Sequence, residues 1–222
     1  MLNRLRRSAG VDAGFTLPEL LITIVILASI IVPLGNLVIG YFQNVGVTTI
    51  RFNESHDAQL SAGYFAQDIA SLGVRTSASP VATLAQSIET SVAYNAGLYP
   101  CGAAGTPTAI VRVAWNQYAA APAATSTLIT VSYVEKTVGT QTQLHRITCS
   151  NGSGVVDSVI AHELDPATPP SVTCYSTGTT VTPCSGSGAA LPNAVRLTLA
   201  VKDPGDAGAS YAVTLTGQRR QS

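Results

Sequence analysis

The sequence predicts an α+β protein in which one long N-terminal helix packs against a C-terminal antiparallel β-sheet. Three observations support this prediction. An uncharged, largely apolar segment runs from Leu20 to Phe42. From Val45 onward, apolar residues recur at spacings of three to five, as they do on one face of a helix. After residue 109, short runs rich in valine, isoleucine and threonine alternate with turn residues, which is typical of antiparallel strands.

We expect a single helix from Phe15 to about Leu72, with an apolar half over residues 15–43 and an amphipathic half over 44–73. Pro33 should kink it, because proline lacks an N–H and its ring clashes with the carbonyl of Ser29. Gly73 is predicted to end it. One face of the second half is apolar: Val45, Thr49, Phe52, His56, Leu60, Phe65, Ile69 and Leu72. The other face is polar: Arg51, Glu54, Asp57, Gln67 and Asp68.

Residues 74–222 are predicted to form a β-rich globular domain, which begins with a short helix over residues 81–94. Two hairpins are expected in it. One turns at Val138-Gly139, and the other turns through Asp203-Pro204-Gly205-Asp206, a sequence that strongly favours a turn. The predicted strands are Ile110–Tyr118, Leu128–Glu135, Gln143–Cys149, Val155–His162, Val195–Lys202 and Tyr211–Thr216.

The charge of the chain argues against nucleic-acid binding. Its 222 residues include twelve basic and twelve acidic side chains. Residues 1–14 hold three of the basic ones, Arg4, Arg6 and Arg7, and one acidic one, Asp12. Without them nine basic and eleven acidic residues remain, a net charge of about −2 that lacks the basic footprint of a nucleic-acid-binding protein. We interpret Arg219 and Arg220 as a solvated tail.

The four cysteines are expected to form disulfides outside the cell. An arginine-rich leader places the N-terminus in the cytoplasm, so all four cysteines follow the apolar helix on the oxidising side. Three connectivities are possible. The short loop between Cys174 and Cys184 favours that pair, which leaves Cys101 with Cys149, and the other two connectivities stay open. No Cys-x-x-Cys motif occurs, so disulfides are favoured over a metal site.

No phosphate-binding loop, nucleophile elbow or H-E-x-x-H motif occurs in the sequence. His56, His145 and His162 are therefore interpreted as surface or packing residues, and Trp115 as a packing residue. Asp203 and Asp206 are few ligands for calcium, which takes six to eight oxygens, so the turn interpretation is favoured and no cofactor is expected.

The most specific motif is Gly14-Phe15-Thr16-Leu17-Pro18-Glu19-Leu20-Leu21, between the basic leader and the apolar run. It resembles the processing site of type IV prepilins and type II secretion pseudopilins. The resemblance implies that a prepilin peptidase cleaves after Gly14 and that the new amine of Phe15 is methylated. It also implies that Glu19 pairs with the amine of a neighbouring subunit during assembly, with Thr16 hydrogen bonding nearby.

An ordinary secretory signal and a plain membrane anchor are the alternatives at this end of the chain. A secretory signal has an apolar core of about 7–15 residues and a small-residue cleavage site. The run from Leu20 to Phe42 has 23 residues, enough to span a bilayer, and no such site follows it. A plain anchor would leave Glu19 and the Gly14-Phe15 junction unexplained.

We therefore expect a non-enzymatic structural subunit, held in the cell membrane with residues 74–222 extracellular or periplasmic, and assembled into a filament. The implied partners are other pilin or pseudopilin subunits, the prepilin peptidase, an assembly platform protein and membrane lipid. Short stretches at 64–73 and 191–197 resemble J-type pseudopilins and W-type minor pilins. The rival hypotheses are a membrane-anchored extracellular binding domain that does not polymerise and a secreted hydrolase.

Overall fold

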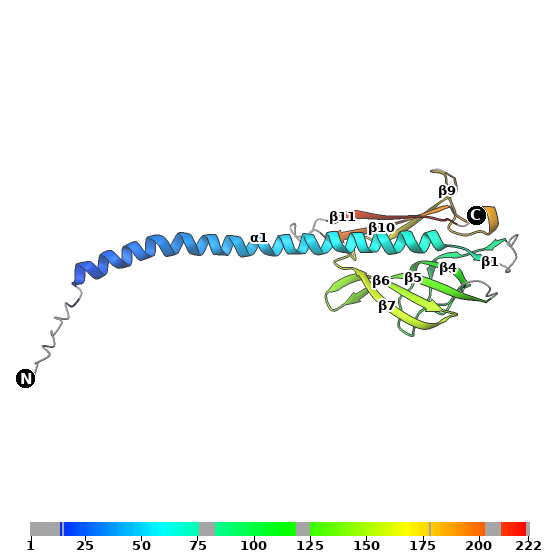
Figure 1. The fold of residues 1–222 in the computed structure, drawn as a ribbon, viewed down its shortest axis with the longest axis horizontal. Coiled ribbons are helices and arrows are strands. Elements are labelled where there is room, and N and C mark those ends of the chain that lie inside the picture. Colours follow the sequence, from blue (N-terminus) through cyan, green and yellow to red (C-terminus); the bar gives the residue numbers. More distant parts are fainter. Residues whose placement is uncertain are drawn as a thin grey trace, which may run out of the picture. The chain divides into compact units, whose positions relative to one another are not determined.

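The computed structural model describes residues 14, 16–75, 83–118, 125–177, 179–202 and 210–220. The chain divides into two compact units, Met1–Thr49 and Ile50–Ser222, called here the N-terminal and C-terminal units. Helix α1, Leu17–Ser71, contributes residues to both (Figure 1). It continues through Pro33 and ends two residues before Gly73, whose N–H donates to the carbonyl of Ala114 at 3.1 Å. The kink at Pro33 stays a prediction.

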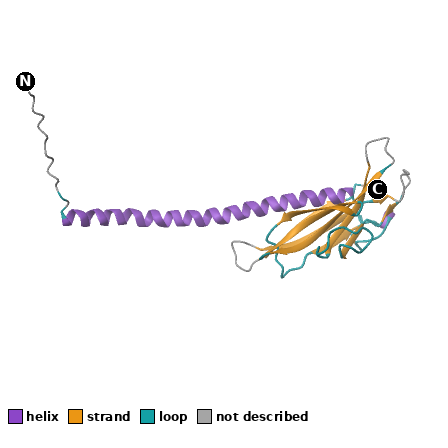
Figure 2. Ribbon diagram, turned by 90° about the horizontal axis from the view of Figure 1, so that it is seen from below, coloured by secondary structure: helices purple, strands orange, loops and turns teal. Residues whose placement is uncertain are grey.

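Antiparallel strands make up most of the remaining regular structure of the described C-terminal unit (Figure 2). A five-stranded sheet has the order β3-β4-β5-β6-β7, a four-stranded sheet the order β11-β10-β8-β9, and β1 pairs with β2. A short 3-10 helix, Gly188–Ala190, precedes β10. The strands are β1 Val74–Arg75, β2 Leu84–Ala85, β3 Ile88–Val92, β4 Ala109–Tyr118, β5 Ser126–Val138, β6 Gln141–Ser150, β7 Ser153–Ala161, β8 Ser171–Tyr175, β9 Val181–Thr182, β10 Ala194–Lys202 and β11 Ser210–Gln218.

The six predicted strands are confirmed, as β4, β5, β6, β7, β10 and β11. The β5–β6 hairpin is closed by the pair Val138–Gln141 across the expected turn. Strands β10 and β11 pair from Ala194–Gln218 to Lys202–Ser210. Their turn, with the candidate calcium ligands Asp203 and Asp206, lies outside the described residues.

The predicted helix over residues 81–94 is wrong. Its described part holds β2 and β3 instead. Strand β3 pairs with β4, where Ile88 lies opposite Val113 and Glu89 opposite Arg112. This pairing outweighs local helix propensity because Ile88 is fully buried against the sheet. The described strands form separate antiparallel sheets, with β3 to β7 in one, β8 to β11 in another, and β1 with β2 in a third.

The main core of the C-terminal unit lies where the end of α1 meets both sheets. Phe65, Ile69 and Leu72 of the predicted apolar stripe are fully buried there, and Figure 1 shows this part of α1 with β10 and β11 on one side and β4 to β7 on the other. Burying one such side chain contributes about 1.5–3 kcal/mol. The buried part of the predicted stripe does not reach back to residue 52, because Phe52 is 71% exposed.

Two disulfides join the four cysteines, Cys101 with Cys149 and Cys174 with Cys184. The first lies in a second buried cluster with Ala109, Val134 and Ile147, and it ties the segment between β3 and β4 to β6. The second ties β8 to the residues after β9. Each disulfide therefore restrains a segment that has little regular structure of its own.

Gly217 of β11 allows the sheet to approach α1 closely. A Cβ at this position would lie 2.4 Å from the Cβ of Ile69. We expect Gly217→Ala to lower the free energy of unfolding by about 1–3 kcal/mol through overpacking. The matched control is Thr216→Ala at the exposed neighbouring position, for which we expect a change within about 0.5 kcal/mol. Urea unfolding of the detergent-solubilised chain measures both, and equal effects would contradict the close-approach argument.

Candidate functional site

The N-terminal end of α1 is formed by Thr16 and Glu19. The helix begins at Leu17, so Thr16 occupies the N-cap position, and its carbonyl accepts the N–H groups of Glu19 and Leu20 at 3.0 and 3.1 Å. The Thr16 hydroxyl donates to the Glu19 carboxylate at 3.4 Å. Thr-Leu-Pro-Glu has the spacing of a capping box, which can be read from the sequence, but the contact found here joins the two side chains and not a side chain with a backbone N–H.

Pro18 fits this helix start. In the first turn a backbone N–H has no partner within the helix, so proline loses nothing there. The glutamate also lies where the positive end of the helix dipole stabilises a negative charge, an effect of about 0.3–1 kcal/mol. The motif therefore starts the helix and positions a carboxylate at its first turn.

Gly14 is exposed, and a Cβ added to it would meet no atom within 4 Å. Within the described part of the chain, nothing requires glycine at this position. A requirement for glycine would therefore come from a molecule that acts on the chain. Phe15 and the leader residues 1–13 lie outside the described residues.

Residues Leu17–Gly46 of α1 are long enough and apolar enough to cross a membrane. Their large side chains are exposed, among them Leu20, Ile24 and Ile31. Eighteen large apolar side chains of this segment are exposed. Their contact with water would be costly, at about 25 cal/mol for each Å² of apolar surface. The segment therefore needs lipid or other apolar helices around it.

Three polar side chains within this segment donate hydrogen bonds to the helix backbone. The hydroxyl of Thr23 donates to the carbonyl of Glu19 at 2.7 Å, and that of Ser29 to the carbonyl of Ile26 at 2.7 Å. The amide of Asn44 donates to the carbonyl of Gly40 at 2.9 Å. These bonds satisfy polar groups that would otherwise lack partners in an apolar environment.

A buried ion pair fixes α1 to the five-stranded sheet in the C-terminal unit. The Arg146 guanidinium donates to both Asp68 oxygens, at 2.7 and 2.8 Å, and the Tyr133 hydroxyl donates to the same carboxylate at 2.6 Å. Burial, and then the Asp68 charge, raise the pKa of Tyr133 well above its usual value, so the phenol stays a donor. Asp68 of the predicted polar face is therefore buried, and its charge is compensated by Arg146 inside the protein.

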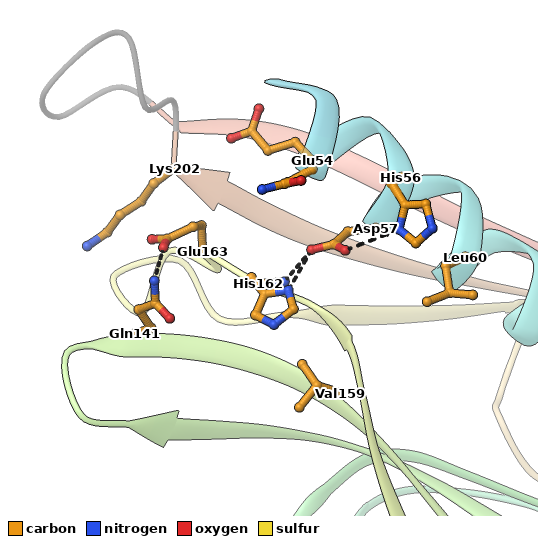
Figure 3. A pocket seen from close by; sticks show the side chains of 10 residues that line it. Glu54, His56, Asp57, Leu60, Gln141, Val159, His162, Glu163 and Lys202 are labelled. Carbon is orange, nitrogen blue, oxygen red and sulfur yellow. Dashed lines mark hydrogen bonds and ion pairs between the residues drawn. The ribbon is translucent and has the colours of Figure 1, made fainter. Parts of the chain in front are cut away.

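A cavity of about 800 Å³ opens beside α1 where the two sheets diverge (Figure 3). The His162 backbone N–H donates to Asp57 at 3.0 Å, and its ring Nδ1 lies 2.8 Å from the same oxygen. The Gln141 amide donates to Glu163. We call this cavity the acidic pocket; its lining is Asn53, Glu54, His56, Asp57, Leu60, Gln141, Val159, His162, Glu163 and Lys202.

The remaining residues singled out from the sequence pack against, or form hydrogen bonds with, other parts of the C-terminal unit. His145 is buried between Asp157 and Gln143, and Trp115 packs against the main core. The interpretation of Arg219 as a solvated tail is corrected, because its guanidinium donates to Pro192 at 3.1 Å and to the Asn193 side chain at 2.6 Å. Among the described residues, no three His, Cys, Asp or Glu side chains are placed to hold a metal ion.

Comparison with known families identifies one match. The prokaryotic N-terminal methylation motif matches residues 11–35, which cover Gly14, the capping residues and the first part of the apolar segment. No curated protein matches the chain.

Proposed function

Because the chain carries the prepilin-type N-terminal methylation motif of type IV pilins and pseudopilins, we propose that it is a structural subunit of a type IV pilus-like filament. The observation that carries this proposal is the order along the chain of Gly14, the side-chain contact between Thr16 and Glu19, and the exposed apolar helix. Proteins with this motif are generally non-enzymatic. The architecture of a long apolar helix followed by β-sheets that pack on its second half supports the same function.

In this proposal each part of the chain has one role. Residues 1–14 are a leader removed by the prepilin peptidase. Residues 15–43 lie in the cell membrane and later in the filament core. Residues 44–73 carry the globular domain, 74–222, which is extracellular or periplasmic. The resemblance of short stretches to J-type pseudopilins and W-type minor pilins favours a minor subunit that starts or caps the filament.

Assembly in this proposal depends on Glu19. The carboxylate pairs with the methylated amine of Phe15 of a neighbouring subunit after an assembly platform protein brings the two together. In apolar surroundings an unpaired charge is costly, so the pair selects the axial position of each new subunit. Thr16, which contacts the same carboxylate, orients it before the partner arrives.

Cleavage between Gly14 and Phe15 tests the proposal directly. In a host with the peptidase, the intact mass of membrane-extracted protein should correspond to residues 15–222 plus one methyl group. Gly14→Leu should leave uncleaved precursor, because a large side chain crowds the peptidase. The matched control is Gly35→Leu, another position where an added Cβ meets nothing within 4 Å, and it should be cleaved normally. An intact Met1 terminus in the wild-type protein would reject the proposal.

A further inference from the structure

One polar side chain inside the apolar segment of α1 differs from its neighbours. The hydroxyls of Thr23 and Ser29 and the amide of Asn44 each donate to a carbonyl of their own helix. Asn36 is exposed, and among the described residues no hydrogen bond joins its side chain to any other group. The described chain therefore leaves the donors and the acceptor of the Asn36 amide unused.

Asn36 lies well inside the part of the helix that is expected to cross the membrane. It stands sixteen residues after Leu20 and six before Phe42, which are rises of about 24 and 9 Å along the helix axis. Lipid tails form no hydrogen bonds, so an unpaired amide at this depth is costly. Within the described residues, α1 is the one helix that could cross a membrane, so a partner for the amide has to come from another molecule.

The turns around Asn36 place a second unsatisfied group on the same side of the helix. Residues three, four and seven apart share one side of a helix, and Ser29, Pro33, Asn36 and Gly40 form such a set, called here the Asn36 face. Pro33 has no N–H to donate to the Ser29 carbonyl, which therefore lacks its usual helical partner. A Cβ at Gly40 would meet no atom within 4 Å, so the described chain does not require this glycine. In a membrane helix, glycine lets another helix approach closely.

The groups on the Asn36 face determine what can cover it. The amide both donates and accepts and the Ser29 carbonyl needs a donor, so the complement is a neutral side chain with an N–H or O–H group. A charged side chain would add its own burial cost. The large apolar side chains of Leu27, Leu34 and Val38 lie on the other side of α1, where lipid or any apolar helix suffices.

We propose that the Asn36 face binds a transmembrane helix of a different pilin-like subunit, and that an amide or hydroxyl side chain of that helix forms hydrogen bonds with Asn36. This inference rests on the proposed function, because a filament subunit shares the membrane with other subunits that carry the same N-terminal motif. A minor subunit that starts or caps a filament has neighbours different from itself, so a second copy is not the expected partner. A single polar residue at a helix interface fixes register and partner choice.

The shared motif also predicts the depth of the partner's polar side chain. Helices with this motif run parallel, because their leaders lie on the same side of the membrane. Pairing of Glu19 with a neighbouring Phe15 amine shifts two such helices by four residues, about 6 Å. The partner's amide or hydroxyl is therefore expected within about one helical turn of the depth of Asn36.

Photocrosslinking in membranes of a host with the complete machinery tests this contact. The full chain carries photoreactive benzoylphenylalanine in place of Val32, which is exposed and lies one turn before Asn36. We expect a cross-link to the membrane-spanning peptide of another pilin-like subunit, with an asparagine, glutamine, serine or threonine within one turn of the linked residue. Asn36→Leu should lower the yield about three- to tenfold. Asn36→Gln keeps the amide and should retain most of the yield.

Asn44→Leu is the matched control. It removes the same group from the same helix, but Asn44 already donates to the carbonyl of Gly40, so the yield should stay nearly unchanged. The inference would be overturned by a yield that Asn36→Leu does not lower, by a cross-link to lipid or to a second copy, by a linked peptide without such a polar residue, or by no cross-link. Normal cleavage and incorporation alongside any of these results would leave the proposed function standing. Failure of the wild-type chain to be cleaved and incorporated would remove the proposed function, and the inference with it.

Discussion

Asp68→Ala is expected to lower the free energy of unfolding of the C-terminal unit by about 3–5 kcal/mol, because it leaves Arg146 charged and half-buried without its counter-ion. The Asp68 side chain is 3% exposed and accepts three hydrogen bonds, from Tyr133 and Arg146. The measurement is urea unfolding of the full chain in detergent. Trp115 is the single tryptophan and packs against the main core, so its fluorescence reports on this unit.

Asp157→Ala is the matched control. Asp157 also pairs with a cation, Lys136, and it contacts the buried His145 ring. Its side chain is 37% exposed, and exposed pairs contribute about 0–1 kcal/mol, so we expect a smaller loss than for Asp68→Ala. The two alanine variants thus remove the same group from ion pairs that differ in burial. Equal losses would show that burial of Asp68 does not determine its contribution.

A combined replacement distinguishes the effect of an unpaired charge from the effect of lost packing. Asp68→Leu with Arg146→Met and Tyr133→Phe removes all the polar partners together and keeps side chains of similar size. Replacing a whole buried polar group with apolar residues is often neutral or stabilising. We expect this triple variant to be more stable than Asp68→Ala, and a lower stability would contradict the uncompensated-charge explanation.

Glu19→Ala is expected to leave membrane insertion and cleavage intact and to reduce incorporation into filaments strongly. Removing a carboxylate from an apolar segment favours insertion. The Phe15 amine of the neighbouring subunit would then be buried without its counter-charge, at a cost of about 3–5 kcal/mol. The measurement is the ratio of this subunit in sheared filament fractions to that in membranes.

Thr16→Val is the control for the contact between Thr16 and Glu19. It removes the hydroxyl that contacts Glu19 and keeps the carboxylate, so incorporation should fall much less. Wild-type incorporation of Glu19→Ala would remove the electrostatic role of Glu19. Absence of the wild-type protein from every filament fraction, in a host with the complete machinery, would favour the anchored binding domain.

Sequence reasoning failed where contacts between distant residues outweighed local preference. Residues 81–94 have a composition compatible with a helix, but β3 is a strand because β4 pairs with it. Asp68 has the polarity of a surface residue, but its partners Tyr133 and Arg146 lie 65 and 78 residues away. Arg219 was assigned to a free tail, although its partners lie 26 to 28 residues earlier. No local pattern marks any of these partners.

The sequence by itself determined the features whose physics is local. The apolar segment and the Gly14–Glu19 motif depend on composition and order along a few turns of helix, and the six long strands depend on alternating residues between turn signals. Only the tertiary structure decided how the described strands divide into three sheets and which helix charges are buried. The acidic pocket arises because segments far apart in the sequence meet beside α1 in the C-terminal unit, a result of packing that no single segment encodes.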